Sequence, residues 1–357
     1  MAQSRQDVLN QFRLSRLIWP ILIGVLVLAF AVYKISQEDI TFDKILEHTT
    51  WQSMVGWLAL GFLCMVLRDI GYIWRMRILT DEKLTWRSAF EVTILWEFAS
   101  ALTPSVVGGS ALAIFMLIKE KISAGRSTAI VFVTIFLDEL FYILILPVFL
   151  SLVGREIIFE PISQTESSFG TGLIFAYWIA YSLIIAYTIF LAFALFFRPE
   201  GTARAIKKIF SWRLFKRWER GAHTLSEDLL LASREFSSKP FSFWIRSWTA
   251  TVFAWLGRYL VLNCVLSMFT GLSLYQHLVA FARQVVMFQI MLVSPTPGGS
   301  GFAEGAFQQM LSEFAPAAGT ILILAFLWRL ITYYPYMFVG IPLLPRWLRR
   351  VFPATKA

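Results

Sequence analysis

The sequence predicts an all-α polytopic membrane protein with two inverted repeats, each containing a re-entrant helical hairpin broken at Gly-Gly. Three observations predict this fold: long apolar runs, an uneven distribution of charge over the loops, and an internal repeat. Hydrophobic residues make up 57% of the 357 residues and charged residues only 15%. Soluble domains carry about 25% charged residues. Because so few polar residues cannot cover the chain, we expect one integral membrane domain over residues 1–357.

Several apolar runs are long enough to cross a membrane. A spanning helix needs about 20 mostly apolar residues. Six segments meet this requirement: Leu17–Ile35, Trp51–Trp74, Ser127–Val153, Gly170–Phe197, Trp244–Thr270 and Ala317–Leu344. The first follows a basic tail, as a signal peptide does, but its apolar run is long and further spans follow. We therefore expect it to be a retained first helix.

Charged residues predict the orientation of the spans. Lys and Arg gather in the loops around Arg75–Arg87 and Lys119–Arg126, in the segment Arg198–Lys239 and in the C-terminal tail. Acidic residues gather around Glu38–Glu47 and Glu156–Glu166. The positive-inside rule then places the basic loops and both termini on the cytoplasmic side of the cell membrane. The basic segment also carries interleaved aromatic residues, which favours an amphipathic helix on anionic lipid over a nucleic-acid site.

Two segments cannot be ordinary spans in this topology. Ser88–Ile118 begins and ends on the cytoplasmic side, and Pro104 and Gly108-Gly109 interrupt its middle. Tyr275–Phe314 begins and ends on the opposite side, and its middle reads Ser-Pro-Thr-Pro-Gly-Gly-Ser-Gly. We expect two re-entrant hairpins that open to opposite sides. A pair of closely packed full crossings in each segment is the alternative.

An internal repeat agrees with the two hairpins. Shifting the chain by 190 residues places Gly108-Gly109-Ser110 on Gly298-Gly299-Ser300, and Arg68 on Arg258. The repeats are predicted at 51–153 and 244–345, joined by a span and a basic cytoplasmic segment over 154–243. In the predicted topology the two copies have opposite orientations. Inverted repeats with matched Gly/Pro breaks are typical of transporters whose site lies near the middle of the membrane.

Ionisable residues inside spans are candidates for function because charge is costly in lipid. Arg68 and Asp69 lie near the cytoplasmic end of a span. They either have a functional role or snorkel, extending their side chains to the membrane interface. Glu139 and Arg329 occupy equivalent positions in the two repeats, where they either pair or line a shared cavity. Glu304 either caps a helix or handles a substrate or proton. The candidates deep in apolar sequence are Glu97, Asp138, Glu139, Arg258, Arg283, Glu304 and Arg329.

The breaks themselves are candidate binding sites. Helices that start after Gly109 and Gly299 would present free backbone N–H groups and a partial positive charge to an anion such as a lipid phosphate. The candidate residues at the breaks are Gly108, Gly109, Ser110, Pro297, Gly298, Gly299, Ser300 and Gly301. The sequence contains no HExxH, GxSxG, Walker or CxxC motif. We therefore expect no enzyme activity, cofactor or metal.

The segment Ser294–Ala306 resembles the Pro-Gly-Gly-x-Gly-x-x-Glu-Gly signature of the lysylphosphatidylglycerol synthase transmembrane-region family, also called flippase-like. This family includes the membrane half of the multiple peptide resistance factor. Leu102–Gly109 and Trp328–Tyr334 are similar to its weaker motifs. The resemblance implies that Gly298, Gly299, Gly301, Glu304 and Arg329 are site residues. The chain departs from the family in the first motif, which often has an acidic residue directly after the glycines and a basic residue slightly later. Ser110 and Ile114 stand in that region of this chain.

The resemblance implies translocation of a phospholipid or polyprenyl-linked lipid between leaflets, with membrane lipids of anionic headgroup as the partners. No soluble aminoacyl-transferase domain follows Leu344, so synthesis of an aminoacyl lipid is not expected. Two alternatives stay open. The first is a membrane-bound lipid-modifying transferase with Glu304 or Asp138 as its base. The second is a non-transporting assembly partner in which the intramembrane charges are structural pairs. The lipid, the coupling ion, the direction and the oligomeric state are open.

Overall fold

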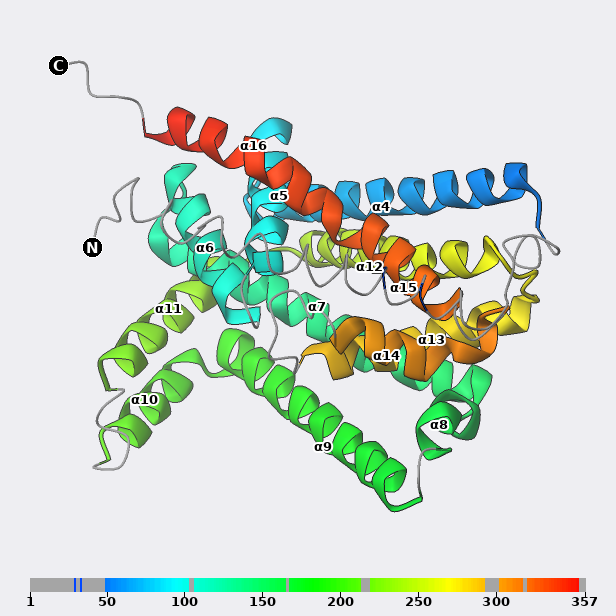
Figure 1. Cartoon of the computed structure of the whole chain (residues 1–357). Coiled ribbons are helices and arrows are strands. Elements are labelled where there is room, and N and C mark those ends of the chain that lie inside the picture. The colour runs from blue at the N-terminus through cyan, green and yellow to red at the C-terminus, as the bar shows by residue number, and fades with distance from the viewer. Residues whose placement is uncertain are drawn as a thin grey trace.

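A computed structural model shows a bundle of long and short helices (Figure 1). The structure describes residues 49–102, 106–164, 167–212, 219–292, 302–316 and 320–352, together with Ala29 and Tyr33. No strand occurs among these residues. The predicted all-α class is therefore confirmed for the described part of the chain.

Five helical segments among the described residues are long and apolar enough to cross a membrane. They agree with five of the six predicted spans, and the sixth, Leu17–Ile35, lies outside the described residues apart from Ala29 and Tyr33. The fifth segment, Thr320–Val351, consists of two consecutive helices. The helices that form these segments are α4 (Trp51–Leu79), α7 (Ala124–Val153), α9 (Ser167–Ala192), α12 (Phe241–Ser267), α15 (Thr320–Thr332) and α16 (Tyr334–Val351).

Shorter helices complete the bundle. Two helical hairpins lie between the long helices, and the break of each falls partly or wholly outside the described residues. The first consists of α5 (Trp86–Leu102) and α6 (Val106–Lys119), and the second of α13 (Leu274–Leu292) and α14 (Phe302–Leu311). The connecting helices are α8 (Arg155–Ser163), α10 (Pro199–Phe210) and α11 (Glu219–Ser237), with the short π-helix η1 (Phe193–Phe197) and the short 3-10 helix η4 (Ser312–Phe314).

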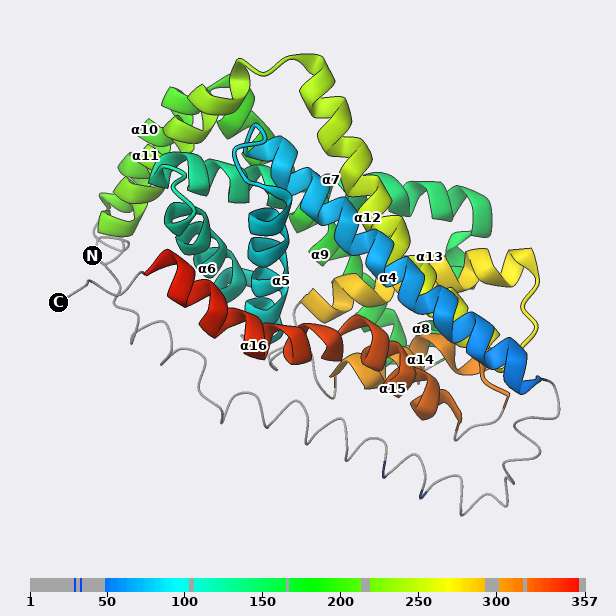
Figure 2. The same cartoon turned by 90° about the horizontal axis from the view of Figure 1, so that it is seen from above.

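Helices α4 and α12 pack side by side and antiparallel along most of their length (Figure 2). Small residues allow the close approach. A Cβ atom on Gly257 would lie 2.9 Å from the Cys64 carbonyl oxygen and 3.0 Å from the Arg68 nitrogen. A Cβ atom on Gly71 would lie 3.0 Å from the Ala254 nitrogen and 3.1 Å from the Ala250 carbonyl oxygen. Because both sets of contacts involve backbone, the crossing point is fixed beside Arg68 and Gly257.

The ends of several helices meet at one end of the bundle, which we call the basic end. Asp81, in the turn after α4, pairs with Arg126 of α7 at 2.6 Å and with Lys239, just before α12, at 2.5 Å. Burial raises the pKa of Asp81, but the hydrogen bonds from Lys239 and Arg126 outweigh burial and leave that pKa below its ordinary value. The charged carboxylate therefore ties α4, α7 and α12 together at this end.

The two hairpins have their outer ends at opposite ends of the bundle. Arg350 pairs with Glu91 of α5 and with Glu120, directly after α6, so both outer ends of the first hairpin lie beside the C-terminus of α16. The second hairpin meets the other end of α12. Asn263 donates a hydrogen bond to the His277 carbonyl, and Thr270 donates one to the Phe314 carbonyl.

The close α4–α12 contact predicts that Gly257→Ala destabilises the protein. The added methyl group would press on backbone atoms of α4, and such overpacking costs about 1–3 kcal/mol. The thermal unfolding midpoint of the purified protein in detergent should therefore fall. Gly56→Ala is the matched control on α4, because a Cβ there has nothing within 4 Å. An unchanged midpoint for Gly257→Ala would contradict the described packing.

Candidate functional site

Arg68 lies at the α4–α12 crossing and is completely buried. Its guanidinium pairs with Glu97 of α5 at 2.7 Å and with Asp69 at 3.0 Å. It also donates a hydrogen bond to the Tyr336 hydroxyl of α16. Tyr336 in turn donates a hydrogen bond to Asp69 at 2.6 Å. Arg68 therefore links three helices, which excludes the snorkelling left open by the sequence.

Arg75 forms a second ion pair on the same helix. It donates two hydrogen bonds to the carboxylate of Asp138 on α7, at 2.5 and 3.1 Å. Trp255 donates a third hydrogen bond to Asp138 at 2.8 Å, and Arg75 also bonds Thr251 at 3.1 Å. The sequence predicts Arg75 in a basic loop, and this prediction is wrong because α4 continues to Leu79 and buries the side chain.

One aromatic ring separates the two arginines. The guanidinium carbons of Arg68 and Arg75 lie 4.7 and 4.8 Å from the centroid of Tyr72. Such cation–π contacts partly compensate for the loss of water around each guanidinium. The carboxylates of this group are partly exposed, with side-chain exposures of 22% for Asp69, 27% for Glu97 and 24% for Asp138. The group therefore has buried cations and an accessible acidic side. We call Arg68, Asp69, Arg75, Glu97 and Asp138 the central cluster.

Arg258 lies next to Gly257 on α12, beside the central cluster. Its guanidinium carbon lies 5.2 Å from the ring centroid of Trp255 and 4.7 Å from that of Phe288. It interacts electrostatically with Glu97. Among the described residues, however, Arg258 forms no ion pair, whereas Arg68, Arg75, Arg283 and Arg329 each pair with a carboxylate. The residue is partly buried, and aromatic faces hold its guanidinium.

Glu304 and Arg329 form a separate ion pair between α14 and α15. The Arg329 Nε lies 3.3 Å from Glu304, and both side chains are about 6% exposed. Arg329 also stacks on Tyr333 at 4.0 Å, and the Tyr333 hydroxyl donates a hydrogen bond to the Ala101 carbonyl at 2.9 Å. Arg329 therefore pairs with Glu304, and not with Glu139 as one of the two predictions held. The contacts connect the second hairpin to the end of α5 in the first.

Glu139 follows Asp138 of the central cluster on α7 but forms none of its ion pairs, and Arg283 lies apart from the cluster. Glu139 is half-buried on α7, and its Oε2 atom is buried without a hydrogen-bond partner among the described residues. Arg283 is fully buried towards the end of the bundle opposite the basic end. It donates hydrogen bonds to the carbonyls of Ile157 and Met310 and pairs with Glu313 at 2.9 Å. These contacts engage the nitrogens of the Arg283 guanidinium, so the role of Arg283 is structural.

The glycine breaks are described only in the first hairpin. Helix α6 begins at Val106, so Gly108 and Gly109 lie within its first turn, and the expectation that the helix starts after Gly109 is wrong. A Cβ on Gly109 would collide with the side chain of Ser100, so this glycine allows α5 and α6 to approach. Ser110 is half-buried in the same helix. The predicted residues Pro297, Gly298, Gly299, Ser300 and Gly301 lie outside the described residues.

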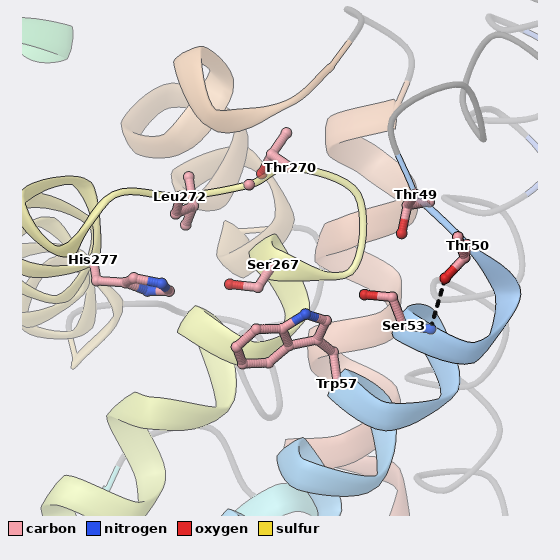
Figure 3. Close-up of a pocket in the computed structure, with 9 residues that line it drawn as sticks. Thr49, Thr50, Ser53, Trp57, Ser267, Thr270, Leu272 and His277 are labelled. Atoms are coloured by element: carbon pink, nitrogen blue, oxygen red, sulfur yellow. Dashed lines mark hydrogen bonds between the residues drawn. The ribbon is translucent and has the colours of Figure 1, made fainter.

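A separate pocket of about 550 Å³ opens at the end opposite the basic end, between the start of α4 and the end of α12 (Figure 3). It contains none of the predicted site residues. Several of its hydroxyls already serve the helix ends: Thr50 accepts a bond from the Ser53 nitrogen, and Ser267 donates to the Asn263 carbonyl. The pocket is neutral and does not supply charge to a headgroup.

Sequence reasoning missed the residues that complete the central cluster. Tyr72 and Arg75 follow Arg68 by four and seven positions, which places all three on one face of a helix. This spacing was a signal for a charged stripe continuing along α4. No comparable signal pointed to Trp255 or Tyr336, because their contacts with Asp138 and Asp69 depend on how distant helices pack.

The buried pair predicts that Asp138→Asn destabilises the protein. The change leaves Arg75 buried without its counter-charge, and breaking a buried pair in this way costs about 3–5 kcal/mol. The unfolding midpoint in detergent should fall accordingly, and it should recover in part when Arg75 is also replaced by Met. Glu82→Gln is the control, because its pair with Arg246 is half-exposed and such pairs contribute less than about 1 kcal/mol. Equal effects of Asp138→Asn and Glu82→Gln would show that the Arg75 pair is not buried.

Comparisons with known proteins agree with this architecture. The chain is 25% identical over 331 residues to a UPF0104 membrane protein of Archaeoglobus fulgidus, and the match covers 90% of this chain and 93% of the relative. No solved structure matches the chain at a significant level. The family model of the lysylphosphatidylglycerol synthase TM region matches residues 17–340. With its apolar helices, the chain is a multi-pass membrane protein and belongs to the lysylphosphatidylglycerol synthase TM region family.

Proposed function

We propose that the protein translocates a phospholipid or polyprenyl-linked lipid between the leaflets of the cytoplasmic membrane, and that Arg258 binds the anionic headgroup. The observation that carries this proposal is the state of Arg258. It is a cation in the middle of a spanning helix, and among the described residues it stacks on aromatic rings without an ion pair. A charge inside a membrane is costly, and such residues mark the path of a substrate or ion.

Inverted repeats explain why the charged residues converge. Shifting the bounds of α4 by 190 gives 241–269, and α12 spans Phe241–Ser267. The same shift of α5 gives 276–292, and α13 spans Leu274–Leu292. Because α4 and α12 are antiparallel, equivalent elements run in opposite directions. A two-fold axis in the membrane plane would pass near Arg68 and Arg258, which the shift superimposes. This correspondence supports a site at the axis, where transporters of inverted repeats bind substrate.

Helix length and the position of the hairpin ends support re-entrant hairpins. At 1.5 Å per residue, the 17 residues of α5 and the 14 of α6 are about 25 and 21 Å long. In the second hairpin, the 19 residues of α13 are about 28 Å long, and the 10 residues of α14 only about 15 Å. The hydrocarbon of a bilayer is about 30 Å thick. Each hairpin also begins and ends at one end of the bundle. We infer that both hairpins turn back inside the membrane, and that the basic end and both termini face the cytoplasm.

The charge balance bears on the kind of headgroup. Three arginines, Arg68, Arg75 and Arg258, face the three carboxylates of the central cluster, so this group is close to neutral without a ligand. Asp69 and Glu97 pair with Arg68, and Asp138 pairs with Arg75, which leaves Arg258 as the cation of this group without an ion pair among the described residues. A lipid phosphate presents several acceptor oxygens and matches the planar donors of a guanidinium. The acyl chains would stay in the bilayer while the phosphate passes Arg258.

Translocation and lipid modification predict different requirements. A transferase using Glu304 or Asp138 as base would act on lipid in detergent, whereas translocation needs two leaflets. Asp138 accepts bonds from Arg75 and Trp255, and Glu304 pairs with Arg329. Both carboxylates are therefore held as ion-pair partners, which suits a scaffold better than a proton acceptor. We propose that the protein is a transporter and not an enzyme.

This proposal predicts that Arg258→Gln slows lipid translocation. Purified protein is reconstituted into phosphatidylglycerol-containing vesicles, and the loss of a fluorescent phosphatidylglycerol from the inner leaflet is followed with a membrane-impermeant quencher. Loss of a charge-assisted contact of about 1.5–3 kcal/mol should slow translocation about tenfold or more. Arg246→Gln is the matched control, since Arg246 lies on the same helix but is half-exposed at the basic end.

Translocation by Arg258→Gln at the wild-type rate would contradict the assignment of the headgroup site. Equal rates in empty vesicles and in vesicles with wild-type protein would contradict translocation of this lipid. Conversion of the lipid in detergent would instead favour the transferase. If Arg258→Gln lowers only the unfolding midpoint and the wild-type protein moves no lipid, the assembly-partner alternative is favoured.

A further inference from the structure

We propose that Glu139 is a proton-binding site that couples lipid movement to a pH gradient. The inference rests on the proposed function and names its energy source. The acidic residues inside the helices differ in whether they have a cation beside them. Asp69, Glu91, Glu97, Asp138 and Glu304 each pair with an arginine. Among the described residues, Glu139 forms no ion pair, and its buried Oε2 atom has no hydrogen-bond partner.

The surroundings of Glu139 explain why it has no cation. It lies near the middle of α7, a helix of 30 residues, and its neighbour Asp138 is already held by Arg75 and Trp255. On the other side α9 runs alongside α7, where the Tyr181 hydroxyl donates a hydrogen bond to the Ile143 carbonyl at 3.0 Å. An ionised carboxylate in such a place is costly, whereas a protonated one is not. Glu139 therefore suits a change of protonation state.

The inverted repeat supplies a reason for the missing partner. In the second repeat, Glu304 of α14 pairs with Arg329 of α15. Shifting these positions back by 190 gives Ile114 of α6 and Glu139 of α7. The first repeat thus keeps an ionisable residue at one position of the pair and an apolar one at the other. A pair that stabilises the second repeat is reduced in the first to a single carboxyl group, which is free to bind and release a proton.

Few titratable groups act on Glu139. Asp138 precedes it on the same helix, and Tyr187 faces it from α9. The charged residues of the other packed helices are engaged elsewhere. Arg258 of α12 stacks on Trp255 and Phe288, Arg283 of α13 bonds α8, and Lys119 at the end of α6 lies over Phe352. No cation among the described residues therefore holds Glu139 in its ionised form.

The proton balances the charge of the lipid. Glu139 accepts one proton from the compartment at lower pH, which forms an O–H bond on the carboxylate, and releases that proton to the compartment at higher pH. Arg258 and the central cluster together carry three arginines and three carboxylates and are nearly neutral. A phosphate bound to Arg258 adds one negative charge, and protonation of Glu139 removes one. Lipid and proton then move in the same direction without net charge transfer. A transmembrane pH difference would accumulate the lipid in the leaflet that faces the higher pH.

The test uses the full-length protein in sealed vesicles with a pH difference of one unit. Fluorescent phosphatidylglycerol is allowed to reach its steady distribution, and a luminal pH indicator records proton movement. With one proton per lipid, a one-unit difference supports a leaflet ratio of up to about tenfold. Wild-type protein should approach this ratio, and Glu139→Gln should give the same ratio with and without the gradient. Glu139→Asp should restore the response, and Glu82→Gln, at the exposed basic end, should retain it.

The outcomes separate the two proposals. In one outcome, wild-type protein moves lipid with a leaflet ratio that does not depend on the pH difference and without proton movement into or out of the lumen. That result would show that proton coupling is wrong and that translocation stands. A gradient response that survives in Glu139→Gln would show that another group carries the proton. If wild-type protein moves no lipid in either condition, the proposed function itself fails. Should Glu139→Gln not fold, the luminal pH signal of wild-type protein and the Glu139→Asp response still decide the matter.

Discussion

An arginine inside a bilayer has no bulk water around it, so it requires a counter-charge or an aromatic face, and this requirement organises the middle of the protein. Antiparallel packing of α4 on α12 places Arg68 and Arg75 against helices that supply carboxylates. The packing depends on Gly71 and Gly257, because a larger residue would separate the backbones. Small residues at the crossing therefore determine where the charges meet.

The same requirement separates structural charges from functional ones. Arg283 is saturated by carbonyls and Glu313, and Arg329 lies on Glu304 and Tyr333, so each stabilises the position of a hairpin. Arg258 and Glu139 differ, because neither has an ion-pair partner among the described residues. One is a cation suited to a phosphate, and the other is an acid suited to a proton. Function is thus expected where the pairing of charges is incomplete.

Most of the fold could be predicted from sequence, because span length and loop charge are local properties. Five spans were predicted correctly, and each of the two segments predicted as hairpins contains a pair of helices. Details that depend on distant contacts were not predictable. Helix α4 extends beyond the predicted span and includes Arg75, and α6 begins before its glycines. Arg329 pairs with Glu304 and not with Glu139. Such choices follow from which helices pack together, and the sequence alone does not contain that information in readable form.

The central claim is that two halves of opposite orientation bring their hairpins to the same place from opposite sides. Site-directed labelling tests it most directly. In a background with Cys64 and Cys264 replaced by serine, Lys119→Cys and Ser312→Cys are treated with a membrane-impermeant maleimide in vesicles of known orientation. Lys119→Cys should react only from the side of the basic end, and Ser312→Cys only from the other side. Reaction of both from the same side would contradict the inverted arrangement.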